Sequence, residues 1–286
     1  MQTLKDLAVL CTSTCTSKDG STEISGITLQ SAAVQPGDMF AALPGLHVHG
    51  AHFVEDACQR GASAVLTDPE GARIVASTGV NNIPLLVVDD IRAVLGRVSA
   101  AIYGNPSYDV PVIGITGTSG KTTTSYLIES AFRTAGHSVG MIGTTGSRIN
   151  GVRVPSSLTT PEAPDLQRLF ATMRDDGVHR IVMEVSSHSL LLGRVGGTRF
   201  RIGAFLNLSQ DHLDFHHTME EYFQAKARLF TKDSGTCCDR AVICIDDSWG
   251  LRMRDIAEAS GCTPVTVSTT GNADYSVCLL YTSLSG

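Results

Sequence analysis

The sequence predicts an α/β protein, with a small N-terminal α/β domain followed by a larger P-loop-type domain built on a mainly parallel sheet. Three observations support this class. Apolar runs of strand length alternate with segments of helical period. A glycine-rich loop stands between one such strand and the helix after it. The turn Gly104-Asn105-Pro106-Ser107 divides the 286-residue chain, which is long enough for two domains.

The first predicted domain spans residues 1–105 and is expected to be a small α/β domain. The apolar positions 91, 94, 95, 98 and 102 follow a helical period, and Gly61 is suited to end a helix at its C-cap. We expect strands at 24–29, 38–43, 64–67 and 85–88, and helices at 53–60 and 90–103.

The second predicted domain spans residues 106–275. Ligands of such parallel sheets bind beyond the carboxyl ends of the strands, so the residues after each strand are candidates for a site. Residues 276–286 remain unassigned. We expect strands at 110–116, 138–143, 180–186, 202–208 and 241–245, and helices at 122–135, 162–176, 218–231 and 248–260.

Composition favours an ordinary soluble globular protein of a reducing compartment. The net charge is −6 and no basic cluster is present, which argues against nucleic-acid binding. The eight cysteines form no C-x-x-C pair, and Cys244, in an apolar run, is expected to be a buried thiol. The N-terminus is a poor signal peptide and no apolar run is long enough to span a membrane, so we expect a cytoplasmic protein.

The stretch GITGTSGKTTT at Gly114–Thr124 is typical of a phosphate-binding loop. Its glycines allow backbone N–H groups to face a polyphosphate, and the following helix N-terminus adds its positive dipole end. Lys121 would reach the β- and γ-phosphates, and the Thr122 hydroxyl would hold Mg²⁺. The strict spacing requires glycine where Ile115 stands, so Gly117 is expected to supply the turn. The alternative is a glycine-rich turn with a surface lysine.

Charged residues follow three of the predicted strands. Glu184 ends one strand and is suited to bind Mg²⁺, although a carboxylate paired with a buried arginine would look the same. Asp211–His216 packs two acids and two imidazoles into six residues, and His212 alone could equally be a core histidine. Asp247 or Ser248 could simply cap the next helix. Ser186-Ser187-His188 lacks the G-x-S-x-G turn of a serine hydrolase, so we reject the interpretation of this segment as a hydrolase site.

Several motifs together resemble one family. The chain is similar over residues 22–275 to the Mur ligases of peptidoglycan synthesis. It most resembles those members that add a third amino acid, meso-diaminopimelate or L-lysine, to UDP-N-acetylmuramoyl-L-alanyl-D-glutamate. The motifs that carry the resemblance are TGTSGKTTT, MEVSSHSLLLGRV, LNLSQDHLDFH, SSLTTPEAPDL, ITLQSAAVQPGDMFAALPG and the Ala225-Lys226 helix.

The resemblance implies an ATP-dependent ligase. A substrate carboxylate would attack the γ-phosphate to give an acyl phosphate and ADP, and the amine of the third amino acid would displace phosphate. Lys121, Glu184, His212 and Lys226 would be catalytic, and Thr122, Glu184, His212 and Lys226 would bind Mg²⁺, with Lys226 as a CO₂-derived carbamate. From spacing alone, Lys226 would be a solvated helix lysine. The implied ATP-binding residues are Gly117, Thr118, Ser119, Gly120, Lys121, Thr122 and Thr123.

The implied partners are small molecules only, namely the UDP-linked dipeptide and the amino acid. Leu29 and Ser31 match residues at the uridine end, although Ser31 could be plain turn chemistry. The oligomeric state is open, with a monomer favoured. The residues that match contacts to the muramoyl-dipeptide are Thr159, Thr160, Ser186 and Arg194.

The chain departs from the family pattern in four places. Gln30 and Ala32 flank Ser31 where the family commonly has an acid and a base, Leu192 replaces a polar contact, and Cys244 replaces an asparagine. From the family pattern we also expect that the third, Rossmann-like domain is missing from this chain and that 276–286 is a foreign tail. We therefore expect the chain alone to bind ligands but hardly turn over. The alternatives are another Mur-type or folylpolyglutamate-synthase-like ligase, or a non-catalytic nucleotide-binding module.

Overall fold

The structure is a computed structural model that describes residues 2–12, 14–15, 20–80, 82–154 and 159–276. Contacts along the chain divide it into two compact units, each built from three segments. The N-terminal unit comprises Met1–Val110, Pro161–Gly177 and Leu192–Thr198. The central unit comprises Pro111–Thr160, Val178–Leu191 and Arg199–Gly286.

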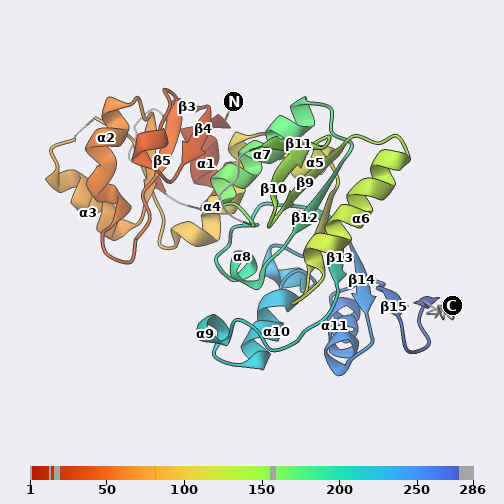
Figure 1. Cartoon of the computed structure of the whole chain (residues 1–286). Coiled ribbons are helices and arrows are strands. Elements are labelled where there is room, and N and C mark those ends of the chain that lie inside the picture. The colour runs from red at the N-terminus through yellow and green to blue at the C-terminus, as the bar shows by residue number, and fades with distance from the viewer. Residues whose placement is uncertain (1, 13, 16–19, 81, 155–158, 277–286) are drawn as a thin grey trace. The chain divides into compact units, whose positions relative to one another are not determined.

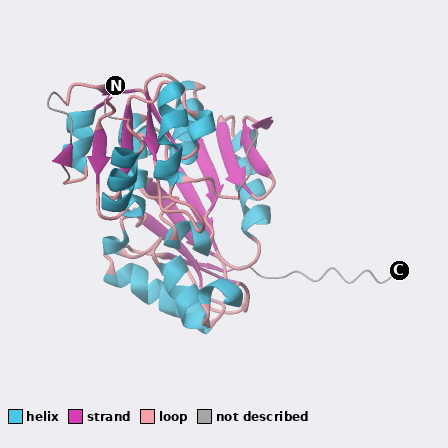
Figure 2. Cartoon of the chain, turned by 90° about the vertical axis from the view of Figure 1, so that its left-hand side faces the viewer, coloured by secondary structure: helices cyan, strands magenta, loops and turns pink. Residues whose placement is uncertain are grey.

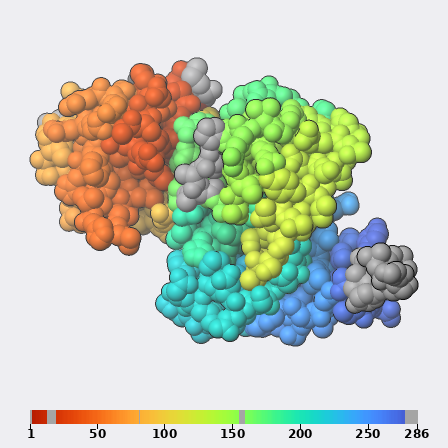
Figure 3. All heavy atoms as spheres, in the orientation of Figure 1, coloured from red at the N-terminus to blue at the C-terminus, as the bar shows by residue number. Residues whose placement is uncertain are grey.

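The N-terminal unit is built on a five-stranded sheet in the order β2-β7-β6-β5-β4, parallel except for β2. Figure 3 shows one outer face of this unit, on which the atoms of its first residues are coloured red to orange. The strands are β2 (Thr14–Cys15), β4 (Gly26–Thr28), β5 (Asp38–Ala41), β6 (Ala64–Thr67) and β7 (Leu85–Val87), and β1 (Gln2–Thr3) pairs with β3 (Glu23–Ile24). The helices are α1 (Leu4–Leu10), α2 (Val54–Gln59), α3 (Pro69–Ser77), α4 (Ile91–Ile102), α5 (Pro106–Asp109) and α7 (Ala163–Asp175).

Both faces of this sheet are buried, which explains its uninterrupted apolar strands. Along β5, Met39 belongs to one apolar cluster and Phe40 to another. The same alternation holds for Leu66 and Val65 on β6. A strand covered on both faces has no polar side, so its sequence is a continuous apolar run.

The central unit is built on a nine-stranded sheet in the order β11-β10-β9-β12-β8-β13-β14-β15-β16, in which only β10 and β11 run antiparallel to their neighbours. Figure 2 shows helices beside its strands. The strands are β8 (Val112–Thr116), β9 (Val139–Gly143), β10 (Gly146–Ile149), β11 (Val152–Val154), β12 (Arg180–Glu184), β13 (Phe200–Phe205), β14 (Arg240–Cys244), β15 (Val265–Ser268) and β16 (Tyr275–Ser276). The helices are α6 (Lys121–Thr134), α8 (Ser187–Leu191), α9 (Leu213–His216), α10 (Met219–Ala227) and α11 (Ser248–Ala259).

The predicted fold class is confirmed, and most elements lie within a few residues of their predicted ranges. The strand predicted at 24–29 is interrupted at Ser25, and the helix predicted at 218–231 ends at Ala227. The helix predicted at 162–176 forms, but its contacts group it with the N-terminal unit. Several elements that are short or carry charged residues were not predicted, namely α1, α3, α5, α8, α9, β1, β2, β10, β11, β15 and β16. The boundary predicted after residue 105 stays a prediction.

The cysteines that the structure describes are free thiols. Cys244 is half-buried rather than buried as predicted, because β14 alternates between a covered and a partly open face. No helix among the described residues is long and apolar enough to cross a membrane.

The central strand β8 positions the candidate site. It lies between β12 and β13 and runs parallel to both, so the carboxyl ends of all three strands meet at one edge of the sheet. Gly114 makes this packing possible, because a Cβ there would lie 2.7 Å from the Phe200 ring. The glycine-rich loop leaves β8 at this edge and leads into α6 (Figure 1).

Candidate functional site

The loop Gly117–Gly120 has the backbone that its glycines predict. Gly117 has a φ of 150° and Gly120, the N-cap of α6, has a φ of 84°. A Cβ on Gly117 would lie 3.0 Å from the Cβ of Leu206. Gly117 therefore supplies the turn, as the sequence predicted. It also allows the loop to approach the end of β13 closely, which the sequence did not indicate.

The residues after β13 hold this loop in place. The Thr118 amide donates to the Asn207 carbonyl at 3.1 Å, and the Ser119 amide donates to the Asn207 side chain at 3.0 Å. The Thr118 hydroxyl donates to the Ser209 carbonyl and lies 3.3 Å from the Tyr222 hydroxyl. Sequence analysis missed the role of Asn207, because its partners lie almost 90 residues away and nothing local marks it.

Two lysines converge on one carbonyl oxygen of the loop. Lys121 Nζ donates to the Gly117 oxygen at 2.8 Å and to the Thr118 oxygen at 2.9 Å. Lys226 Nζ, on α10, donates to the same Gly117 oxygen at 3.0 Å and lies over the Tyr222 ring. Lys226 is buried, at 1% exposure. The structure thus brings two predicted site residues together that are 105 positions apart.

Burial and the neighbouring Lys121 charge lower the pKa of Lys226 to about 7, against a weaker opposing effect of Asp211. Burial also lowers the pKa of Lys121, while Glu184 and Asp211 act in the opposite direction. Two neighbouring ammonium groups that share one acceptor repel each other, so the loss of the Lys226 proton relieves this contact.

Glu184 ends β12 and is 1% exposed. Its Oε1 accepts from the Thr122 hydroxyl and from the Thr144 amide, both at 3.0 Å, and its Oε2 accepts from the Thr144 hydroxyl at 3.0 Å. The backbone is close here too, since a Cβ on Gly143 would lie 2.2 Å from Oε1. No arginine or lysine of the described residues forms an ion pair with Glu184. The alternative of a carboxylate paired with a buried arginine is therefore wrong.

Thr122 and Glu184 fit a magnesium ion. A buried carboxylate is costly unless a cation or hydrogen bonds compensate it, and Glu184 has hydrogen bonds but no basic partner. Mg²⁺ prefers oxygen ligands and is usually held by one or two protein groups, with waters and phosphates completing the shell. Within the described part of the chain, no cluster of three His, Cys, Asp or Glu side chains could hold a metal alone. The protein thus offers a partial site.

His212 lies apart from this pair. Its backbone is left-handed, with a φ of 53°, and its side chain is half-exposed, with Nε2 3.5 Å from Asp211 Oδ2. Its ring makes an edge contact with His188, which stacks on Phe215 at 4.0 Å. Since its ring is open to solvent, the alternative of a satisfied core histidine does not describe it. Its place on a second Mg²⁺ stays a prediction.

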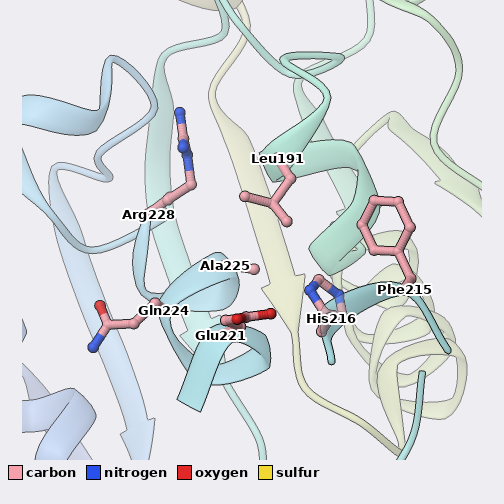
Figure 4. Close-up of a pocket in the computed structure, with 7 residues that line it drawn as sticks. All are labelled: Leu191, Phe215, His216, Glu221, Gln224, Ala225 and Arg228. Atoms are coloured by element: carbon pink, nitrogen blue, oxygen red, sulfur yellow. The ribbon is translucent and has the colours of Figure 1, made fainter. Parts of the chain in front are cut away.

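His216 is the buried histidine of this cluster. Nε2 lies 2.8 Å from the Ser187 hydroxyl, and Nδ1 has no hydrogen-bond partner among the described residues. Burial, with the neighbouring His188 and Lys226, lowers its pKa to about 4, so the ring is neutral near pH 7. It lines an open pocket of about 280 Å³ (Figure 4). The other residues that line it are Leu191, Phe215, Glu221, Gln224, Ala225 and Arg228.

The residues implied for the UDP-linked dipeptide divide between the two units. In the central unit, the Thr160 hydroxyl donates to the Glu184 carbonyl at 3.0 Å, and Ser186 accepts from the Ser189 amide at 3.1 Å. Thr159 precedes Thr160 and is half-buried. These contacts give Thr160 and Ser186 structural roles next to Glu184, in addition to the implied ones.

In the N-terminal unit, Arg194 is held by Glu162. Arg194 Nε lies 2.8 Å from Glu162 Oε1, and Arg92 lies 3.5 Å from the second carboxylate oxygen. Arg92 also donates to the Leu192 carbonyl at 3.2 Å, which fixes the segment that carries Arg194. One carboxylate between two guanidinium groups leaves the group with a net positive charge, suited to an anionic ligand.

The remaining implied residues of this unit lie near its sheet. Leu29 follows β4 and is packed against an apolar cluster. Ser31 begins a 3₁₀ turn and its side chain hydrogen-bonds Asp56. In the central unit, Asp247 caps α11 by accepting from the Gly250 amide, which confirms the capping alternative. Asp246 accepts from Ser268 and Thr269, so it too has a structural role.

Comparisons with known proteins identify the family. A model described as "Mur ligase middle domain" matches residues 115–284, which is more than half of the chain. The chain belongs to the Mur ligase family. A second model, "Mur ligase family, catalytic domain", matches residues 23–103.

Curated relatives agree with this membership of the Mur ligase family. The chain is 54% identical over 269 residues to UDP-N-acetylmuramoyl-L-alanyl-D-glutamate–2,6-diaminopimelate ligase of Corynebacterium glutamicum, covering 93% of this chain and 51% of that protein. It is 53% identical over 256 residues to the Streptomyces coelicolor protein of the same name, covering 90% and 49%. The chain thus spans about half the length of the curated relatives it matches.

Solved structures show the same Mur ligase fold. A structure of UDP-N-acetylmuramoyl-L-alanyl-D-glutamate–2,6-diaminopimelate ligase superposes with a TM-score of 0.78 at 30% identity, covering 96% of this chain and 54% of that one. A MurF structure from Acinetobacter baumannii superposes with a TM-score of 0.64 at 18% identity, which shows the fold alone. The family match reaches residue 284, and the interpretation of 276–286 as a foreign tail stays a prediction.

Proposed function

We propose that this chain is the nucleotide-binding and substrate-binding part of an ATP-dependent ligase. The ligase adds a third amino acid, meso-diaminopimelate or L-lysine, to UDP-N-acetylmuramoyl-L-alanyl-D-glutamate in the cytoplasm. The observation that carries the proposal is the convergence of Lys121, Lys226, Thr122 and Glu184 at one edge of the central sheet. The names of the relatives support the choice of the diaminopimelate-type reaction over the folate-type alternative.

In the proposed reaction, the chain positions charge rather than making covalent bonds to the substrate. Lys121 leaves the Gly117 and Thr118 carbonyls to face the β- and γ-phosphates of ATP, which neutralises charge as phosphoryl transfer proceeds. The first backbone amides of α6 would donate hydrogen bonds to phosphate oxygens. The substrate carboxylate attacks the γ-phosphorus, ADP leaves, and the amine of the third amino acid then displaces phosphate to form the amide.

Thr122 and Glu184 would hold a Mg²⁺ ion at this edge. When bound, the ion supplies Lewis-acid stabilisation of the charge on the transferring phosphoryl group. Thr144 orients the Glu184 carboxylate by donating to both of its oxygens. Arg194, oriented by Glu162, would bind a carboxylate or phosphate of the UDP-linked dipeptide.

We also propose that Lys226 is carbamylated. A neutral amine attacks CO₂, forming an N–C bond and releasing one proton, to give R–NH–COO⁻. The lowered pKa supplies the neutral amine near pH 7. The product replaces a positive charge beside Lys121 with a negative one, turning repulsion into attraction. It also supplies oxygen atoms of the kind that Mg²⁺ prefers.

The first test measures ligand binding by the 286-residue chain. We expect ATP or ADP to bind with an affinity that Mg²⁺ increases, and UDP-N-acetylmuramoyl-L-alanyl-D-glutamate to bind independently of an amino acid. Amide formation is then assayed in a chain completed with the remaining half of the Corynebacterium glutamicum relative. Nucleotide binding without any amide product from the completed chain would favour the non-catalytic nucleotide-binding module.

Carbamylation is tested with ¹³C-bicarbonate and ¹³C NMR. We expect one carbamate resonance that disappears in Lys226→Ala and remains in Lys232→Ala. In the completed enzyme, Lys226→Ala should lower activity, and added short carboxylates should restore part of it. Full activity of Lys226→Ala would end the carbamate proposal while leaving the ligase proposal in place.

A further inference from the structure

Three cysteines gather away from the candidate site, where the chain enters β14 and leaves α11. Cys237 and Cys238 precede β14, and Cys262 follows the turn at Gly261 that ends α11. The Cys237 thiol donates to the Cys238 carbonyl at 3.5 Å, and the Cys262 thiol donates to the same oxygen at 3.4 Å. The two thiols therefore lie around one acceptor, and the Cys237 side chain also hydrogen-bonds that of Cys262.

This convergence is fixed by backbone contacts rather than by the thiols alone. The Cys238 amide donates to the Leu229 carbonyl at 2.9 Å, and the Cys262 amide donates to the Ala257 carbonyl at 3.0 Å. The Ser260 hydroxyl accepts from the Lys232 amide at 3.3 Å, which joins the two loops a second time.

The three thiols differ in their access to an oxidant. Cys237 and Cys262 are half-buried, whereas Cys238 is 3% exposed. Cys238 Sγ faces the sheet, since a Cβ on Gly203 would lie 2.8 Å from it. A bond between Cys237 and Cys238 is disfavoured too, because adjacent Cα atoms are about 3.8 Å apart and disulfides usually need about 4.4–6.8 Å. The pair left is Cys237 and Cys262.

We propose that Cys237 and Cys262 form a redox-active pair that closes to a disulfide in the presence of a peroxide. The Cys262 thiolate attacks the peroxide O–O bond, which gives a sulfenic acid and hydroxide. The Cys237 sulfur then attacks the Cys262 sulfur and water leaves. Two thiols and one H₂O₂ become one disulfide and two waters, and the two electrons reduce the peroxide bond.

The order of the two steps follows from the surroundings of the sulfurs. Burial raises the pKa of Cys237 to about 11, so this sulfur is a poor first nucleophile toward a peroxide in solution. Its attack on the sulfenic acid takes place within one molecule, where proximity compensates for a small thiolate fraction. The disulfide would enclose β14 and α11 in one covalent loop.

Peptide mapping tests the proposal on the 286-residue chain, with no dependence on ligase activity. A Cys278→Ser background is used, so that the tryptic peptide 255–286 carries a single cysteine, Cys262. After treatment with one equivalent of H₂O₂ and alkylation of the remaining thiols, we expect peptide 233–240 to be linked to peptide 255–286. Dithiothreitol should reverse the link.

Two neighbouring substitutions form a matched pair. In the same background, Cys238→Ala should keep the link within about twofold, because this thiol faces the sheet, whereas Cys237→Ala and Cys262→Ala should abolish it. Far-UV circular dichroism of the reduced variants checks that each one folds. If Cys237→Ala does not fold, Cys237→Ser is used in its place. The proposal is overturned if the link survives in Cys237→Ala. It is also overturned if the folded Cys278→Ser chain forms no link under the same treatment.

Thermal unfolding provides a second readout. Closing a loop of about 25 residues removes entropy from the unfolded chain, so the oxidised protein should unfold about 5–10 °C higher than the reduced one. The same treatment of Cys262→Ala should leave Tm within about 1 °C. An oxidised protein with a lower Tm than the reduced one would contradict a pair that is placed for closure.

Discussion

The nucleotide side and the dipeptide side of the candidate site are built differently. On the nucleotide side, one loop of the central unit is held by Asn207, Lys121 and Lys226, and Glu184 is held by Thr122 and Thr144. Among the residues proposed for the dipeptide, Arg194 belongs to the N-terminal unit and Ser186 to the central unit. The residues proposed for the nucleotide all belong to the central unit, where they contact one another.

The two groups of residues also differ in how far their charges are compensated when no ligand is bound. The residues proposed for the nucleotide include the buried Lys226 amine, the half-buried Lys121 amine and the buried Glu184 carboxylate. Each should become more favourable once an anion, a cation or CO₂ is added. The dipeptide side is already compensated, since Glu162 neutralises part of the charge of Arg92 and Arg194. Substitutions on the first side should therefore change stability and binding more than those on the second.

The largest expected effect is on stability, at Lys226. Its pKa is lowered to about 7 in the folded chain, so between pH 7 and pH 10 the unfolded chain binds more protons, and stability rises with pH. Below pH 7 Lys226 is protonated in both the folded and the unfolded chain, so the folded chain bears the full cost of burying its charge. Lys226→Met removes it and should stabilise the chain by about 3–5 kcal/mol at pH 6. Urea unfolding in CO₂-free buffer measures this, and the gain should shrink toward zero near pH 10. Equal gains at both pH values would contradict the buried charge.

Lys121→Ala should weaken ATP binding about 100-fold or more, because a charge-assisted contact to phosphate is lost and no other described side chain replaces it. Isothermal titration calorimetry with ATP and Mg²⁺ measures the loss. Lys232→Ala, on an exposed turn, is the matched control and should bind as the parent does. Near-normal binding by Lys121→Ala would rule out the phosphate loop.

Glu184→Gln should remove the dependence on Mg²⁺ rather than all binding. The amide has the same shape but no charge, so we expect about a 10-fold to 30-fold loss of ATP affinity with Mg²⁺ and little change without it. Titrations at several Mg²⁺ concentrations separate the two cases. An equal loss with and without Mg²⁺ would assign Glu184 a purely structural role.

Glu162→Gln should have the smallest effect of the four. Arg194 keeps its charge but loses the carboxylate that orients it, so affinity for the UDP-linked dipeptide should fall about fivefold while ATP affinity stays the same. Glu162→Asp should restore part of the loss. A parallel fall in ATP affinity would mean that the substitution disturbs the fold instead of the orientation of Arg194.

Sequence patterns predicted the parts of the molecule that depend on neighbours in the chain. The loop at Gly117–Gly120, the strand end at Glu184 and the cap at Asp247 each follow from a few adjacent residues. The hydrogen bonds from Thr118 and Ser119 to Asn207 could not be predicted, because Asn207 follows β13. The Gly117 carbonyl shared by two lysines could not be predicted either, because Lys226 lies on α10. Lys226 shows the limit most clearly, since its helical spacing favoured a solvated lysine and only the resemblance to a family indicated otherwise.

The hydrogen bonds that Asn207 accepts from the loop also limit how a phosphate could approach it. They already occupy the amides of Thr118 and Ser119, so these two donors are not available to a ligand. The unpaired amides of the first turn of α6 remain, and they all point along the helix axis. In the proposed site, a polyphosphate would therefore bind to the amides of α6, with its terminal group toward Thr122 and Glu184. Asn207 would then restrict the direction of nucleotide binding without any contact to the nucleotide itself.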